Sequence, residues 1–417
     1  MNCFMTTIRR LANVGVLVVL IAIANVFAAD DGRAQDLFEQ HRWFELRGVS
    51  VADPYAAALT KGTLASAFNR PVEAERELKL AIHSAKGTEQ LNAAREKLAV
   101  LYLRQGRSRE AVAQMRVAVK RDSSRADLQS MLHLFGPLAG YPPFSTHMPK
   151  GGAELECEVN DDGVWLMAEV NGKPVTWLLD TGFNFSGMSE SEAQSLGIRS
   201  SEGGGSFHDF AGGEATTKAG VIARIALGGI EFRNLPVLIF PDGQPPWQEW
   251  TAGRRGVLGL PVALALQTLS WTRAGKCMAG FTRAERSEAN LAFDDFTPVV
   301  RTTLNGKPLD FVFDTGNQGG TQLWGRFKAD FPEVLATDGG IAGRTMVNQV
   351  GGARDHPTLE IPQLKFEVGG MGVFLQPAKL FDKPVGNDYQ HGLLGMDVFS
   401  QAREILLDFR SMTLVMR

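Results

Sequence analysis

The chain has 417 residues, which at roughly 100 to 200 residues per domain predicts two to four domains with enough material for buried cores. Its formal net charge is -3 and 21% of its residues are charged, both ordinary for a globular protein. The sequence contains no basic stripe and no acidic tail, so the composition indicates neither nucleic acid nor an anionic membrane surface as a partner. Function must therefore be read from individual sites.

Residues 1–29 predict an export signal. Two arginines precede an apolar run at 14–24, and small residues ending in Ala28 and Ala29 follow it. This order is typical of a signal peptide that is cleaved after one of these two alanines. A retained membrane anchor is the alternative, because the stretch comes near the lower limit of about 17 to 25 residues for a spanning helix. We expect an exported protein, periplasmic or secreted, that meets a membrane only if this segment is retained.

Residues 30–135 are predicted to form an α-helical domain. Between 56 and 122 the chain is rich in Ala, Leu, Glu, Lys and Arg, with apolar residues three and four positions apart. One stretch resembles a tetratricopeptide repeat in the spacing of its packing residues, which are Leu98, Ala99, Tyr102, Gly106, Ala111, Met115, Ala118 and Val119. A fainter copy lies upstream, at Ala74, Leu78, Ala81 and Ile82.

This helical stretch holds one good repeat and one degenerate repeat. Gly106 can end the first helix of the good repeat, whereas Asn69 and Pro71 occupy the turn of the fainter copy. Such repeats commonly bind other proteins, but about three of them are needed for a stable free-standing array. Two roles of residues 56–122 therefore remain open: packing against the rest of the chain, or binding a protein partner in the cell envelope.

From residue 136 the chain changes character. Residues 136–154 are rich in proline and glycine and cannot continue a helix, which predicts a linker. Beyond it, short runs of Val, Ile, Phe, Leu and Trp are separated by Gly, Asn and Asp turns, so the rest of the chain is predicted to be β structure. Two β units, 155–283 and 291–417, are separated by a polar linker at 284–290.

The tripeptide Asp-Thr-Gly occurs once in each β unit, at Asp180 and at Asp314. Each copy follows an apolar run that ends in a turn, and the sequence Asn-Gly-Lys-Pro stands nine residues before each aspartate. Later in the units, Gly-Val-Leu-Gly-Leu around Gly259 corresponds to Gly-Leu-Leu-Gly-Met around Gly395. A few helix-compatible residues then lead into one final strand in each unit. The repeated context predicts two related halves.

These residues resemble the aspartic proteases of the pepsin and retropepsin type. In that family an apolar strand leads into Asp-Thr-Gly, a glycine-containing hairpin called the flap follows, and a hydrophobic-hydrophobic-Gly segment packs beside the aspartate loop. The resemblance covers residues 155–417 and implies a mainly β, bilobal fold of closed β lobes with a pseudo-twofold axis. Asp180 and Asp314 are the implied catalytic pair, and Gly259 and Gly395 are expected to pack beside it.

Two neighbouring carboxylates explain why the motif is needed twice. They cannot both ionise readily, so they share a proton, aspartic proteases being the usual example of such a pair. One carboxylate takes a proton from a water, and the other donates to the carbonyl oxygen of the scissile bond. The family implies that Thr181 and Thr315 bond to the opposite loop, while Gly182 and Gly316 permit the tight turn. No cofactor is required, and no histidine or cysteine spacing predicts a metal site.

The flaps are expected in two glycine-rich stretches, 203–213 and 339–352. Residues expected to contact substrate there are Phe207, His208, Phe210, Gly212, Ile341, Val350 and Gly351. A disordered surface loop is the alternative for both stretches. The first stretch has no tyrosine, which departs from pepsin and is closer to the retropepsins. Asp397 in the second unit also matches a retropepsin-like form, whereas Pro261 takes that place in the first unit.

The sequence contains three cysteines, of which Cys157 and Cys277 lie near the two ends of the first β unit. An exported compartment permits a disulfide between them, and two buried thiols are the alternative. Taken together, the patterns predict an exported, single-chain aspartic endopeptidase acting on a peptide or protein substrate. The alternative is a catalytically silent scaffold of the cell envelope that uses the same fold and the helical repeats for binding.

Overall fold

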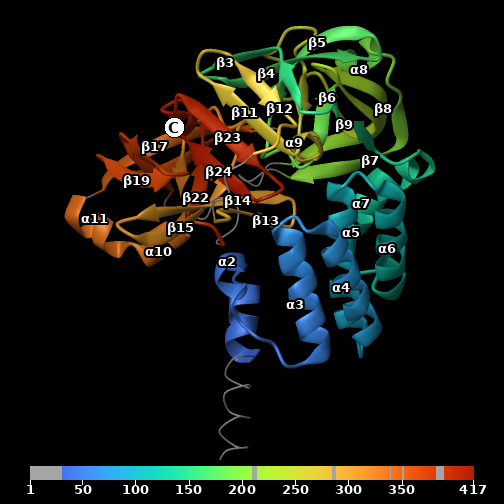
Figure 1. Ribbon diagram of the computed structural model, residues 1–417, viewed down its shortest axis with the longest axis horizontal. Helices are drawn as coiled ribbons and strands as arrows, with labels where there is room; N and C mark the ends of the chain where they lie inside the picture. Colours follow the sequence, from blue (N-terminus) through green and yellow to red (C-terminus); the bar gives the residue numbers. More distant parts are fainter. Residues whose placement is uncertain (1–30, 209–213, 284–287, 339, 350–351, 382–388) are drawn as a thin grey trace, which may run out of the picture.

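The computed structural model describes residues 31–208, 214–283, 288–338, 340–349, 352–381 and 389–417 (Figure 1). An N-terminal helical layer is followed by a mainly β part, as the periodicity of the sequence predicted. The predicted export signal lies outside the described residues. Along the part of the chain that is described, no helix combines the length and the apolar character needed to cross a membrane.

The helical layer starts with a helical stretch at 31–39 and continues through α2 (Trp43–Leu46), α3 (Pro54–Ala67), α4 (Pro71–Ser84), α5 (Thr88–Arg104), α6 (Ser108–Arg121), α7 (Ala126–Phe135) and the 3-10 helix η1 (Gly136–Gly140). Pro54 and Pro71 stand at the first turns of α3 and α4, where a missing N–H is tolerated. Gly106 has a φ of 68° just after α5, and this left-handed conformation ends the helix where the sequence predicted.

Neighbouring helices of the layer pack in pairs, α3 against α4 and α5 against α6. A Cβ atom on Gly62 would lie only 2.7 Å from Leu78, so glycine lets α3 and α4 approach closely. Ala74, Leu78 and Ala111 are fully buried at 0% exposure. Residues whose spacing resembled a tetratricopeptide repeat therefore form buried contacts within the two helix pairs.

The first sheet has the strand order β1-β9-β6-β10-β5-β4-β8-β7, with β3 paired to β4 and β8 also paired to β9. Its strands are β1 (Ser145–His147), β3 (Cys157–Asn160), β4 (Gly163–Val170), β5 (Lys173–Leu179), β6 (Ser186–Ser189), β7 (Ser200–His208), β8 (Glu214–Leu227), β9 (Ile230–Phe240) and β10 (Gly256–Leu258). The short helices α8 (Glu190–Ser195) and α9 (Leu260–Leu266) follow β6 and β10. The segment expected to be a linker, 136–154, thus contributes a strand to this sheet.

The second sheet has the order β17-β18-β21-β16-β22-β15-β14-β19-β20, with β13 paired to β14. Its strands are β13 (Leu291–Asp294), β14 (Thr297–Leu304), β15 (Lys307–Phe313), β16 (Gln322–Leu323), β17 (Ile341–Gln349), β18 (Gly352–Ile361), β19 (Leu364–Val368), β20 (Met371–Leu375), β21 (Ala378–Phe381) and β22 (Gly392–Leu394). Three short helices accompany it, α10 (Gly325–Asp330), α11 (Pro332–Asp338) and α12 (Met396–Phe399).

The two sheets repeat one pairing pattern. β5 pairs in parallel with β10, which pairs antiparallel with β6, and β15, β22 and β16 do the same. Both Asn-Gly sequences form hairpin turns with positive φ at Asn171 (48°) and Asn305 (52°), as Asn-Gly favours. The long β8–β9 hairpin is split in the second sheet into β18–β21 and β19–β20, where Pro362 and Pro377 interrupt the ladder.

A shared sheet joins the two β units, with the order β2-β12-β11-β23-β24. Its strands are β2 (Ala153–Leu155), β11 (Thr268–Thr272), β12 (Cys277–Ala279), β23 (Glu404–Asp408) and β24 (Thr413–Met416). The expectation of one final strand per unit was wrong, because each unit ends in a hairpin. Gly275 (φ 80°) and Met412 (φ 54°) take left-handed conformations in the two turns and reverse the chain.

The helical layer lies against both β units (Figure 1). On the first unit, α7 packs against β7 and β8, and on the second unit α2 and α3 pack against β13. Asn69 also donates from its side chain to the carbonyl of Phe409, at 2.8 Å. Residues 56–122 therefore pack against the rest of the chain, which is one of the two roles left open for them, and the binding of a protein partner stays a prediction.

Candidate active site

Asp180 and Asp314 stand at the ends of equivalent strands. Asp180 follows β5, whose last residue Leu179 is fully buried, and its backbone N–H donates to the carbonyl of Leu258 at 3.0 Å. Asp314 follows β15, whose last residue Phe313 is equally buried. Each aspartate is therefore placed by a rigid strand that is buried next to a parallel neighbour.

The two Asp-Thr-Gly loops are bonded across to each other. The hydroxyl of Thr181 donates to the carbonyl of Phe313 at 2.9 Å, and the hydroxyl of Thr315 donates to the carbonyl of Leu179 at 2.8 Å. Each hydroxyl also accepts the backbone N–H of the opposite threonine, at 3.2 and 3.1 Å. Both threonines have 0% exposure, so these four bonds join the loops in a dry environment.

The glycines bring each loop close to the opposite carboxyl. A Cβ atom on Gly182 would lie 2.4 Å from Cγ of Asp314, and one on Gly316 would lie 2.3 Å from Cγ of Asp180. Any side chain at these positions would overlap a carboxyl, so only glycine permits this approach. Asp180 and Asp314, more than a hundred residues apart in the sequence, are thus brought into one site.

The two carboxyls perturb each other. Burial raises the pKa of Asp180 well above its ordinary value, and the Asp314 carboxyl that it faces raises that pKa further. Burial also raises the pKa of Asp314, although a hydrogen bond from Asp180 and bonds from neighbouring backbone N–H groups partly offset the rise. The pair therefore holds a proton under conditions in which ordinary carboxyls are ionised.

Gly259 and Gly395 pack beside the two loops. A Cβ atom on Gly259 would lie 1.7 Å from the carbonyl oxygen of Phe185, and one on Gly395 would lie 2.8 Å from the side-chain nitrogen of Asn317. Their N–H groups donate to matching hydroxyls, Gly259 to Ser186 and Gly395 to Thr321, both at 3.1 Å. Both glycines thus anchor the chain just after each aspartate.

Asp397 is a supporting residue that the sequence prediction did not include in the site. Its carboxylate accepts the backbone N–H of Thr321 at 2.9 Å and the hydroxyl of Thr321 at 2.7 Å. Thr321 is the residue that holds Gly395, so Asp397 braces the loop that follows Asp314. The signal was present in the sequence, because Pro261 occupies the equivalent place in the first unit and cannot make these bonds.

The predicted flap residues are only partly described. Phe210, Gly212, Val350 and Gly351 lie outside the described residues. Phe207 and His208 pair with Ala215 and Glu214 in the β7–β8 hairpin. Ile341 begins β17, at the opposite end from the tip of the β17–β18 hairpin, and its side chain is 65% exposed. Both glycine-rich stretches therefore form hairpins, while Ile341 is not placed at a hairpin tip.

Cys157 and Cys277 form a disulfide, with their Cα atoms 6.3 Å apart. The bond ties β3 of the first sheet to β12 of the shared sheet. The described part of the chain contains no cluster of three or more His, Cys, Asp or Glu side chains arranged to hold a metal ion. The aspartate pair is the group of ionisable side chains from which we infer the function.

Residues 166–262 match a family model described as "Aspartyl protease", and this stretch contains Asp180 and Gly259. No curated protein matches the chain. The chain is also similar to the crystal structure of a retropepsin-like aspartic protease from Rickettsia conorii, with 16% identity and a TM-score of 0.24. That match covers 33% of this chain and 96% of the other. The family match indicates an aspartyl protease-like domain at residues 166–262, which supports a protease-like function.

Proposed function

We propose that this protein is an exported aspartic peptidase in which Asp180 and Asp314 together activate one water for hydrolysis of a peptide bond. The observation that carries this proposal is the mutual approach of the two Asp-Thr-Gly loops, in which Gly182 abuts Asp314 and Gly316 abuts Asp180. Two aspartates that merely capped separate turns would have no reason to meet in this way. The family match over residues 166–262 supports the same conclusion.

In this proposal the first and second sheets belong to two lobes related by a pseudo-twofold axis that passes between the aspartates. The repeated pairing pattern around β5 and β15 supports this symmetry. The helical layer is proposed to be a degenerate tetratricopeptide-like domain, which the two close helix pairs support. The Cys157–Cys277 disulfide supports export, because disulfides persist in oxidising compartments.

The proposed mechanism assigns different roles to the two carboxyls. Asp314 takes a proton from the water, whose oxygen attacks the carbonyl carbon of the peptide bond, while Asp180 gives its proton to the carbonyl oxygen. The tetrahedral intermediate then collapses as Asp314 gives the proton taken from the water to the departing nitrogen, the C–N bond breaks, and Asp180 takes back the proton from the former carbonyl oxygen. The raised pKa of Asp180 and the hydrogen bonds to Asp314 support this assignment. The substrate is an extended peptide held by strand-like hydrogen bonds to the β7–β8 and β17–β18 hairpins.

The test is peptide cleavage by the full chain and by the single variants Asp180→Asn and Asp314→Asn. Each variant is expected to lose activity by about 10²-fold to 10⁴-fold, the contribution of a positioned acid or base. Asp36→Asn is the matched control, because Asp36 is an exposed aspartate of the helical stretch 31–39, and the activity of this variant should stay within about twofold of wild type. Full activity in either dyad variant would contradict the shared mechanism.

A catalytically silent scaffold is the competing function, and the same preparation tests it. A folded wild-type protein that cleaves nothing in a diverse peptide library, over a wide range of pH, would favour the scaffold. Peptide binding is then measured by fluorescence anisotropy on wild type and on Asp314→Asn. Binding without turnover in both proteins would replace the peptidase proposal.

A further inference from the structure

The aspartate pair has two flanks that are equivalent in topology. One flank, which we call the covered flank, consists of Phe183–Phe185 after the first aspartate and the β13–β14 turn at Asp294–Phe296. The other, the open flank, consists of 317–320 after the second aspartate and the β3–β4 turn at 160–162. The equivalence follows from the matching strands, because β3–β4 and β13–β14 pair in the same way in the two sheets. Any difference between the flanks therefore comes from what lies on them.

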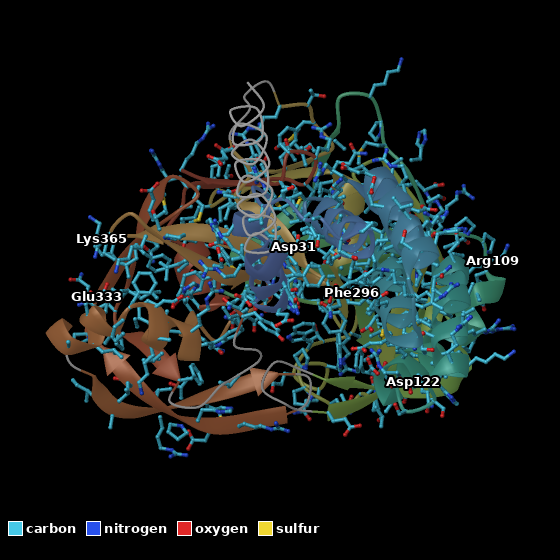
Figure 2. The ribbon with its side chains drawn as sticks, turned by 90° about the horizontal axis from the view of Figure 1, so that it is seen from below. Asp31, Arg109, Asp122, Phe296, Glu333 and Lys365 are labelled. Carbon is cyan, nitrogen blue, oxygen red and sulfur yellow. A yellow bond between two sulfur atoms is a disulfide. The ribbon has the colours of Figure 1, made fainter. Side chains whose placement is uncertain are left out.

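Aromatic rings close the covered flank, and one of them comes from the helical layer. Phe135, the last residue of α7, has its ring centroid 4.7 Å from that of Phe185, which in turn lies 5.4 Å from Phe296. Phe183 and Phe185 are 5% and 8% exposed. Figure 2 shows Phe296 in the middle of the molecule, beside the helices of the layer. Side chains therefore bury the segment just after Asp180.

Charged side chains of α5 fasten the layer to the turn of the covered flank. The ammonium of Lys97 lies 2.8 Å from both carboxylate oxygens of Asp295, and the guanidinium of Arg104 donates to the backbone carbonyl of Asp295 at 2.8 Å. Arg104 is 2% exposed and lies 4.4 Å over the ring of Phe293. These contacts are costly to break, since a buried cation would lose its partners.

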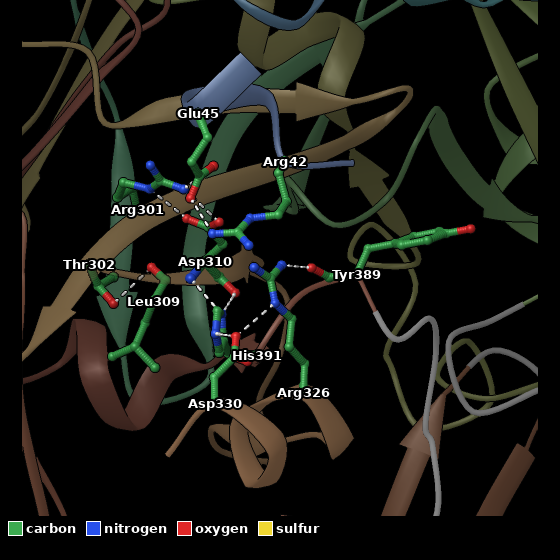
Figure 3. Close-up of polar contacts among 10 residues, drawn as sticks. All are labelled: Arg42, Glu45, Arg301, Thr302, Leu309, Asp310, Arg326, Asp330, Tyr389 and His391. Atoms are coloured by element: carbon green, nitrogen blue, oxygen red, sulfur yellow. Dashed lines mark hydrogen bonds and ion pairs between the residues drawn. The ribbon is translucent and has the colours of Figure 1, made fainter. Parts of the chain in front are cut away.

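The beginning of the helical layer, from His41 to α2, is also bound firmly to the second β unit. Figure 3 shows Glu45 of α2 above Arg301, with 2.9 Å between their charged atoms, while Arg301 also holds Asp310 at 2.8 Å. His41 lies 2.6 Å from Asp294 and stacks on the ring of Tyr389, with 3.8 Å between ring centroids. The cover is thus a fixed part of the fold and not a loosely tethered lid.

The same helix that covers the loop also contacts the flap hairpin. A Cβ atom on Gly205 of β7 would lie 3.4 Å from Leu134 and 3.5 Å from Ser130, both in α7. α7 therefore touches the aspartate loop through Phe135 and the hairpin strand through Leu134 and Ser130. On this side of the dyad, α7 therefore bridges the loop after Asp180 and the β7–β8 hairpin.

Among the residues that the structure describes, none covers the open flank in this way. Gln318, Gly319 and the turn residues 160–162 are exposed. The side-chain amide of Gln318 donates to the carbonyl of Asp162 at 2.8 Å, and this contact is itself at the surface. On this side the described residues that flank the dyad are exposed and not packed under other side chains.

We propose that the helical layer makes the peptidase one-sided: an extended peptide enters over the open flank, and only a short segment fits beyond the scissile bond on the covered flank. The inference rests on the proposed function and narrows its substrate class to unfolded chains or peptides cleaved near one terminus. Displacing the cover would require breaking the Phe135–Phe185 packing and the Lys97–Asp295 pair, which a weakly bound peptide cannot do.

The test uses the full chain and a ladder of peptides. Cleavage sites in a peptide library are first mapped by mass spectrometry, and one cleaved peptide is then lengthened by glycine and serine residues at either its N-terminus or its C-terminus. Lengthening one end is expected to lower kcat/KM by at least about tenfold, while lengthening the other end changes it by less than about twofold. Equal tolerance of both extensions overturns the proposal. If no peptide is cleaved at all, the proposed function itself fails, and this inference fails with it.

A variant locates the block in α7. Phe135→Ala removes the ring that covers Phe185. For the peptide lengthened at the restricted end, this variant is expected to have a kcat/KM at least about threefold higher than that of wild type. Leu80→Ala is the matched control, because Leu80 lies on α4 of the same layer with 52% exposure and should leave the ladder unchanged. Folding of both variants is checked by thermal unfolding. Phe135→Leu, which keeps an apolar side chain, takes its place if Phe135→Ala does not fold. If a folded variant shows the same dependence of kcat/KM on peptide length as wild type, α7 does not form the block.

Discussion

The loops that follow Asp180 and Asp314 are built alike but lie in different surroundings. In both, a glycine N–H from the later segment donates to a hydroxyl, Ser186 in the first loop and Thr321 in the second. The first loop then runs beneath the ring of Phe135 from the helical layer, whereas the second continues through the exposed residue Gln318. A pair of equivalent motifs can thus form a symmetric reaction centre inside an asymmetric substrate path.

The two loops are also stabilised by different means. The first loop is held by apolar packing of Phe183 and Phe185, whose rings are buried. The second loop is rich in glycine, and Asp397 braces it through the backbone and hydroxyl of Thr321. The exposed loop therefore obtains from a carboxylate the rigidity that the covered loop obtains from burial.

The largest effect is expected at the glycines that face the carboxyls. Gly182→Ala and Gly316→Ala each place a methyl group within 2.4 Å of the opposite carboxyl carbon, so each is expected to lower kcat by at least about 100-fold. Similar losses in both variants would support a symmetric centre, and a tolerated substitution on one side would break that symmetry. Gly243→Ala is the control, since a Cβ there meets nothing within 4 Å.

The threonine bonds test the same symmetry through stability. Thr181→Val and Thr315→Val each remove one donor and one acceptor from a buried crossing, which leaves an N–H and a carbonyl without partners. Each is expected to lower the free energy of unfolding by about 2 to 4 kcal/mol, measured by urea denaturation. The two values should agree within about 1 kcal/mol, because the bonds have matching lengths; a much larger gap would show that one loop does not depend on the crossing.

The dyad should make stability depend on pH. The pKa of Asp180 is raised in the folded protein, so the unfolded chain loses this proton first as pH rises above the ordinary value of 3.8. The contribution of Asp180 to stability therefore falls with rising pH, between the ordinary and the raised pKa. Asp180→Asn does not titrate, so its free energy of unfolding should gain on that of wild type as pH increases through this window. A difference that is constant with pH would mean that the carboxyl is not perturbed.

The smallest pair of effects compares the two flanks directly. Phe296→Ala removes a ring that packs on Phe185 beneath the helical layer and is expected to cost about 1 to 3 kcal/mol of stability. Gln318→Ala removes an exposed hydrogen bond on the equivalent side and should cost less than about 0.5 kcal/mol. Thermal unfolding of the two variants measures both. Equal costs would show that the covered flank is not held by packing.

Local patterns along the chain were sufficient to predict several features. An apolar run followed by Asp-Thr-Gly predicted the ends of β5 and β15. The Asn-Gly sequence before each strand is also typical of the hairpin turn found there, although it was noted only as part of the repeated context. Gly106 predicted the end of α5, because a left-handed residue has a strong sequence preference. These features depend on residues that are close in sequence, so their chemistry can be read without knowing the rest of the fold. The final hairpin of the second unit gave no such signal, because the left-handed residue in its turn is a methionine, Met412. In the first unit the signal was present, at Gly275, and the prediction of a single strand overlooked it.

The features that matter most for function depend on residues far apart in the chain. The repeated motif suggested that Asp180 and Asp314 work together, but only the packed lobes bring Gly182 against Asp314 and let one carboxyl raise the pKa of the other. No sequence pattern near Phe135 indicates that its ring lies on the loop after Asp180, because apolar residues at a helix end are common in any core. Long-range packing of the whole chain decides such contacts, and it is this packing that turns two equal motifs into a centre with one open side.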